Sequence, residues 1–131
     1  MSRLFTREEA DEMLPHIAPL LWQGRGLKQE HDACVKRLEE IEQQAKGNGH
    51  GTDVEAASAR SRQQQAVVAI NEIIERVKKM DVEVKDLDIG LIDFRSEKDG
   101  RVVYLCWKLG EEKVEWWHEL DTGYASRQPL D

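Results

Sequence analysis

Residues 101–109 read RVVYLCWKL, and this stretch decides how the C-terminal part of the chain folds. In an extended strand successive side chains point to opposite faces, so every second residue from Val103 to Leu109 lies on one face and every second residue from Val102 to Cys106 lies on the other. Both faces are apolar, which is typical of a strand with neighbours on both sides. Turn signals at residues 99–100 and 110–111 flank it. The stretch therefore predicts the central strand of an antiparallel sheet.

Two further strands are predicted beside it, at about residues 89–95 and 113–120, which gives a small three-stranded antiparallel meander. Residues 113–120 alternate between an apolar and a charged face. His118 falls on the apolar face, while Trp117 falls among charged residues. Whether His118 and Cys106 share a face depends on the register of the hairpin, because a shift of one residue moves every side chain to the opposite face.

Upstream of the meander, residues 6–80 predict a long antiparallel helical hairpin. Apolar residues recur at steps of three and four from residue 17 to 45 and again from 59 to 80, the spacing of a coiled-coil seam. The glycine-rich residues 47–51 provide the connection. His31 interrupts the first seam, where we expect it to fix the register of the two helices rather than to bind a metal.

Capping signals and prolines mark the helix boundaries. Residues 6–9 and 52–55 each form a Thr-x-x-Glu capping box. A proline inside a helix removes a hydrogen bond and clashes with the preceding turn, so we expect a kink near Pro15. If a fresh helix begins between Pro15 and Ile17, Pro19 falls in its first turn, where a missing N–H costs little.

The composition bounds the class of protein. The 131 residues are a normal length for one α+β domain, with residues 6–80 as the helical part and 82–131 as the sheet and a C-terminal tail. The net charge is −7 and the basic residues form no stripe, which argues against nucleic acid as a partner. No apolar run approaches the ~20 residues of a membrane span. Two cysteines without metal-site spacing favour a reducing, cytoplasmic location.

Several segments resemble a known family. They are Phe5-Thr6, Leu14-Pro15, GLIDF at 90–94, VYLCWKLGE at 103–111, Trp117-His118 and GYASR at 123–127. Together they resemble, over essentially the whole chain, the prokaryotic family catalogued as domain of unknown function 2203. The resemblance implies a small stand-alone cytoplasmic protein, and it brings no established activity and no catalytic or binding residue.

A candidate ligand-binding set lies in the C-terminal part of the chain. His118 can titrate, donate or ligate a metal, and Cys106 can join it if the two share a face. Asp93 is unusual inside a strand and needs a partner, which Arg127 or Arg101 could supply. Glu111 in the hairpin turn completes the set of five candidates: Asp93, Cys106, Glu111, His118 and Arg127.

Each candidate also has a structural interpretation, which we favour. His118 can be a half-buried histidine satisfied by one carbonyl or carboxylate. Cys106 on a central strand usually behaves as a small apolar residue. A salt bridge from Asp93 can tie the tail to the sheet, and Glu111 can simply face solvent. No spacing assigns a metal or a cofactor, and we expect none.

Three residues are candidates for an interface. Val67 and Ile74 lie one position beyond the second helical seam, and Trp117 lies on a charged face, where exposed tryptophan is typical of a contact surface. We therefore favour a non-enzymatic interaction or scaffold protein that forms a homodimer or binds another protein. The alternative is a small-molecule or metal-binding protein, with or without acid-base catalysis, whose site surrounds His118. Without a catalytic motif, an enzyme is the weaker choice.

Overall fold

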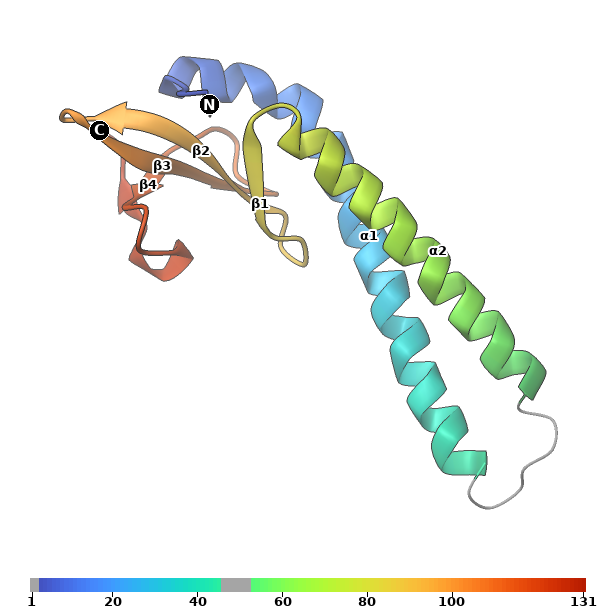
Figure 1. The fold of residues 1–131 in the computed structure, drawn as a ribbon. Coiled ribbons are helices and arrows are strands. Elements are labelled where there is room, and N and C mark those ends of the chain that lie inside the picture. Colours follow the sequence, from blue (N-terminus) through green and yellow to red (C-terminus); the bar gives the residue numbers. More distant parts are fainter. Residues whose placement is uncertain (1–2, 46–52) are drawn as a thin grey trace.

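The computed structural model describes residues 3–45 and 53–131, which form two long helices and one antiparallel sheet. The sheet lies at one end of the molecule, with the N-terminal part of α1 over it, and the rest of α1 extends away from the sheet beside α2 (Figure 1). No helix in these residues combines the length and apolarity needed to cross a membrane. In chain order the elements are α1 (Arg7–Ala45), α2 (Asp53–Lys78), β1 (Val82–Asp86), β2 (Leu91–Lys98), β3 (Arg101–Lys108), β4 (Trp116–His118), the 3-10 helix η1 (Tyr124–Ser126) and β5 (Gln128–Pro129).

The sheet has five strands in the order β1-β2-β3-β4-β5, so the prediction of three strands is wrong. β3 is the central strand, as expected, and β2 and β4 flank it. The prediction missed β1 and β5, which form the two edges of the sheet. β1 has only five residues, of which Glu83, Lys85 and Asp86 are charged, and β5 has two residues and includes Pro129. Charge, shortness and proline are typical of edge strands, and they weaken the strand signal in the sequence.

α1 begins with the predicted capping box and then runs without a break to Ala45. The Thr6 N–H donates to Glu9 Oε1 at 2.9 Å, and the Glu9 N–H donates to Thr6 Oγ1 at 3.1 Å. No fresh helix begins after Pro15, because α1 includes both Pro15 and Pro19. Their spacing of four residues places both rings on the exposed side, where water can satisfy the freed carbonyls. The N-terminal part of α1 nevertheless lies at an angle to the remainder (Figure 1).

α1 and α2 pack side by side and run in opposite directions (Figure 1). Arg37 Nε lies 2.6 Å from Glu55 Oε1, and His31 Nε2 lies 3.5 Å from Gln63 Nε2, so residue numbers rise along one helix as they fall along the other. The predicted glycine connection at 47–51 and the cap at Thr52 lie outside the described residues.

The sheet has two different faces. The first, which we call the helix face, packs against α1 and the C-terminal end of α2; it comprises Ile92, Phe94, Val103, Leu105, Trp107 and Trp117. The second, which we call the tail face, carries Asp93, Tyr104, Cys106 and His118, and the tail residues Tyr124 and Arg127 pack beside them. Both faces of β3 are buried, as its sequence predicted. The helix face therefore forms the apolar core, and the tail face holds the buried ionisable residues Asp93 and His118.

Candidate functional site

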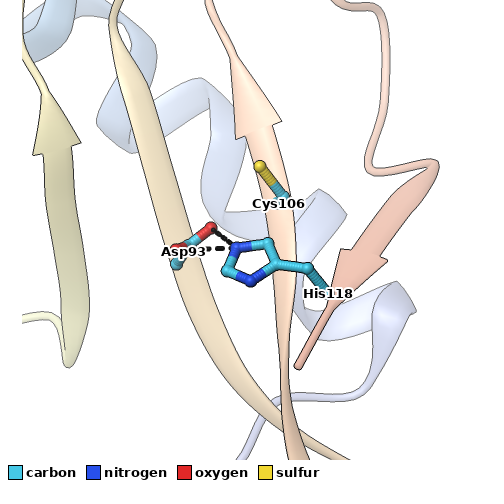
Figure 2. A group of neighbouring side chains, drawn as sticks. All are labelled: Asp93, Cys106 and His118. Carbon is cyan, nitrogen blue, oxygen red and sulfur yellow. Dashed lines mark hydrogen bonds and ion pairs between the residues drawn. The ribbon is translucent and has the colours of Figure 1, made fainter. Parts of the chain in front are cut away.

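Asp93, Cys106 and His118 meet on the tail face, and we call them the Asp-Cys-His cluster (Figure 2). Asp93 on β2 lies directly opposite Cys106 on β3, and His118 on β4 lies opposite Tyr104. Because residues two apart on a strand share a face, His118 and Cys106 are on the same side of the sheet. The His118 ring extends across β3 toward Asp93 (Figure 2). All three residues are buried, with at most 2% of each exposed.

Both ring nitrogens of His118 have partners. Nδ1 lies 2.8 Å from the Glu119 carbonyl oxygen, which can only accept, so Nδ1 carries a proton and donates it. Nε2 lies 3.1 Å and 3.0 Å from the two carboxyl oxygens of Asp93. One further proton therefore lies between Nε2 and Asp93, and the pair is neutral in total. A buried pair of this kind avoids the large cost of an isolated charge.

The surroundings of the cluster favour protonated, neutral groups. Burial raises the pKa of Asp93, although the neighbouring His118 opposes this. Burial, together with the charge of Asp93, raises the pKa of the Cys106 thiol to about 12, and Arg127 only partly opposes this rise. Cys106 is therefore a thiol at neutral pH and a poor nucleophile. Since His118 uses both nitrogens elsewhere, it forms no activating pair with the sulfur.

Native Cys106 should resist alkylation. In a Cys34→Ser variant it is the sole cysteine. A thiol pKa near 12 against an ordinary 9.0 lowers the thiolate fraction at pH 8 about 1,000-fold. We expect iodoacetamide to label the folded protein at least about 100-fold more slowly than the urea-unfolded protein. The folded thiol keeps its proton while the unfolded thiol loses it, so stability should fall as pH rises above about 9. Equal labelling rates in the two states would contradict this assignment.

Tyr104 covers one side of the cluster. Its ring centroid lies 5.3 Å from that of His118, and its hydroxyl donates to Glu83 Oε1 at 3.0 Å. Glu83 also pairs with Lys85 at 2.9 Å and with Arg95 at 3.1 Å. These contacts hold the Tyr104 ring in place and keep water away from His118.

Arg127 and Glu111 cover the other side. Arg127 Nη1 lies 3.0 Å and 3.1 Å from the two Glu111 carboxylate oxygens, and its guanidinium lies over the rings of Trp116 and Tyr124 at 4.8 Å and 4.4 Å. Glu111 Oε1 also accepts the Lys108 backbone N–H at 2.9 Å. This ion pair ties the tail to the β3–β4 connection, and Arg127 lies close enough to Cys106 to influence its thiol.

The structure corrects the predicted partner of Asp93. That partner is His118, whereas Arg127 pairs with Glu111 and Arg101 pairs with Glu119 at 2.8 Å. Glu111 is also largely buried, contrary to the solvent-facing interpretation. A tail salt bridge was expected, and it forms with a different carboxylate, because the spacing of charges in a sequence does not fix which side chains meet across a sheet.

The chain matches one family over nearly its whole length. The profile of the family described as an uncharacterized conserved protein (DUF2203) covers residues 3–130. The chain belongs to this family. No curated protein and no solved structure matches this DUF2203 member.

The Asp-Cys-His cluster of this DUF2203 protein contains three donor types that bind transition metals. Carboxylate oxygen, thiolate sulfur and imidazole nitrogen are all zinc ligands. One donor atom from each residue lies within 4.8 Å of the other two. Tetrahedral zinc with bonds of ~2.0–2.3 Å separates its ligand atoms by roughly 3.3–3.5 Å, so the contraction required is on the order of 1 Å. The hydrogen bond from Nδ1 to the Glu119 carbonyl resembles the outer contact that orients a metal-binding histidine.

The three interface candidates differ in exposure. Trp117 lies opposite Leu105 on the helix face and is only 8% exposed, so the expectation that it is exposed among charges is wrong. The β4 register turns its side chain toward the apolar core, and the cationic groups of Lys98 and Arg101 lie over its ring, 5.2 Å and 5.7 Å from the centroid. Ile74 is half-buried, and Val67 is 40% exposed.

Sequence reasoning missed Glu83, Lys85 and Tyr104 as neighbours of the cluster. Glu83 and Lys85 belong to β1, which was not predicted, although Val82-Glu83-Val84-Lys85 does alternate as a strand should. Tyr104 was recognised only as an apolar residue of the central strand. Its hydroxyl group was a signal, because a buried tyrosine usually finds a hydrogen-bond partner.

Proposed function

We propose that this DUF2203 protein binds a divalent transition-metal ion, with zinc as the best match, through Asp93, Cys106 and His118. The observation that supports this most is the convergence of three different metal donors from three strands in one buried place. An apolar or simply hydrogen-bonded sheet face does not require a thiol beside an aspartate and a histidine. A reducing, cytoplasmic location, which we also propose, would keep Cys106 available as a ligand, and both cysteines are free.

The charge balance of the cluster supports a divalent ion. Without metal, the thiol proton and the proton shared by His118 and Asp93 leave the cluster neutral. A dication with one thiolate, one carboxylate and one neutral imidazole is also neutral. Metal binding therefore exchanges two protons for one dication and adds no net charge to a buried site, where a net charge is costly. Three protein ligands leave the fourth tetrahedral position for water or a small ligand.

Cobalt(II) provides a direct test, because a thiolate ligand gives a sulfur-to-cobalt charge-transfer absorption. Chelator-treated, tag-free protein is titrated with cobalt(II) and then with zinc, which should displace it. Wild type and the Cys34→Ser variant, which lacks only the α1 thiol, should show the absorption, and Cys106→Ser should not. We expect zinc affinity to fall in Cys106→Ser by more than the ~10–100-fold typical of losing an outer contact.

Two results would overturn the proposal: wild type without the cobalt–thiolate absorption, or Cys106→Ser that retains it. Circular dichroism of the metal-free variants shows whether each one folds. An Asp93→Asn variant gives a second measurement of zinc affinity. The amide of this variant can still hydrogen-bond to His118, but an amide is a poor zinc ligand, so the affinity should fall.

We also propose that α1 and α2 form a coiled-coil hairpin that acts as an interaction arm. The inter-helix contacts of Arg37 with Glu55 and of His31 with Gln63 support the pairing. An interaction role is favoured by a specific feature of α2, the exposed residues on its side away from the seam.

A further inference from the structure

The outward side of α2 carries exposed residues that pair with nothing in the described part of the chain. Val67 is 40% exposed and Val68 is 59% exposed, although valine usually lies inside a protein. Arg60 and Glu75 are exposed, and neither lies within 4.0 Å of an opposite charge among residues 3–45 and 53–131. In Figure 1 the green middle of α2 lies beyond the sheet, beside α1.

These residues follow a helical spacing of their own. Arg60, Gln64, Val67, Asn71 and Glu75 are separated by three or four positions, which places them on one side of α2. Val68 borders this stripe, because it lies four positions after Gln64 and three positions before Asn71. The spacing is that of a second coiled-coil seam, separate from the seam that faces α1.

The stripe is complementary to itself in the antiparallel direction. Suppose that two copies of α2 lie antiparallel, with the twofold axis between Val67 and Val68. Val67 of one copy then lies opposite Val68 of the other, Gln64 lies opposite Asn71, and Arg60 lies opposite Glu75. In a twofold dimer every such contact occurs twice. The apolar residues then lie at the centre, amides that can hydrogen-bond to each other come next, and opposite charges lie outside. A parallel arrangement would instead set Arg60 against Arg60 and Glu75 against Glu75.

We propose that a second copy of this chain docks along this stripe, with the two α2 helices antiparallel and the twofold axis between Val67 and Val68. The interface includes the sequence candidate Val67, with the half-buried Ile74 at its margin. Charge complementarity favours the second copy over an unrelated partner, because the matching residues are present on this same helix. The inference is independent of metal binding at the sheet.

A charge-swap series tests the proposal on the full chain by sedimentation equilibrium across a dilution series. Wild type should dimerise. Arg60→Glu and Glu75→Arg should each weaken the dimer at least about tenfold, because each sets like charges opposite one another twice. The double variant R60E/E75R should restore the wild-type dissociation constant, since it exchanges the two signs.

Arg62→Glu is the matched control, because Arg62 is exposed and lies only two positions from Arg60, yet points to nearly the opposite side of the helix. It makes the same charge change off the stripe and should leave the dissociation constant unchanged. A wild type that stays monomeric, equal effects of R60E and R62E, or a double variant no better than the single ones would each overturn the proposal. All of these variants alter exposed residues and should fold.

Discussion

Replacing His118 by alanine in metal-free protein should lower the free energy of unfolding by about 3–5 kcal/mol. The substitution leaves the Asp93 carboxyl buried without the partner that shares its proton. Removing one member of a buried pair costs more than the pair contributes, because an uncompensated polar group stays behind. Urea unfolding monitored by tryptophan fluorescence measures the change, and an unaltered slope shows that the same surface is exposed on unfolding.

The double variant His118→Ala/Asp93→Asn separates the buried charge from the lost packing. If the orphaned carboxyl causes most of the loss, the neutral amide should recover at least about half of it. His31→Ala serves as the matched control, because His31 is half-buried, touches Gln63 and Asp32, and should cost less than about 1 kcal/mol. Similar losses for His118→Ala and His31→Ala would show that the Asp93 contact contributes little.

The loss should also depend on pH in a known direction. Burial raises the pKa of Asp93 in the folded protein, so the unfolded carboxyl ionises first as pH rises above its ordinary value of 3.8. The free energy of unfolding then falls as pH rises from the ordinary pKa toward the raised pKa of the folded protein. In His118→Ala no imidazole offsets the cost of the ionised Asp93 carboxylate. The loss in free energy of unfolding caused by this substitution should therefore be larger at pH 7 than at pH 4. A deficit that grows toward acid would contradict the raised pKa.

Replacing Gly90 by alanine should destabilise the protein by about 2–4 kcal/mol. Gly90 has a φ of 64°, which L-residues rarely adopt, and an added Cβ would lie 2.4 Å from Cγ and Cδ1 of Leu109. Its backbone also holds the start of β2, since its carbonyl accepts the Leu109 N–H at 3.2 Å. Leu109 cannot move without leaving the apolar core, so strain and crowding add together.

Gly100→Ala separates the backbone strain of a positive φ from the steric contact with Leu109. Gly100 has a φ of 79°, and nothing lies within 4 Å of the position its Cβ would take. This variant should cost only about 1–2 kcal/mol. Thermal or urea unfolding of both variants measures the difference, and equal losses would show that contact with Leu109 is relieved at little cost.

Local patterns in the sequence predicted much of this fold. The capping box at Thr6 and Glu9 predicted the start of α1, and the spacing of apolar residues predicted two long helices. The two-sided apolar run from Val102 to Leu109 predicted the central strand. These features succeed because capping, helical periodicity and strand alternation act between residues close in the chain.

Other features failed because they depend on distant residues. The edge strands β1 and β5 are defined by their neighbours rather than by their own composition. The uninterrupted α1 tolerates Pro15 and Pro19 because the opposite side of this segment packs on the core, which local proline rules do not include.

By itself, the sequence determined the class of fold, the central strand and the choice of Asp93, Cys106, Glu111, His118 and Arg127 as residues of interest. Only the tertiary structure decided that His118 shares a proton with Asp93 beside Cys106. It also decided that Glu111 forms an ion pair with Arg127 and that Trp117 faces the core. The reason is register: the side on which each β4 side chain falls depends on how the chain returns between β3 and β4, and a shift of one residue there would exchange His118 with Trp117.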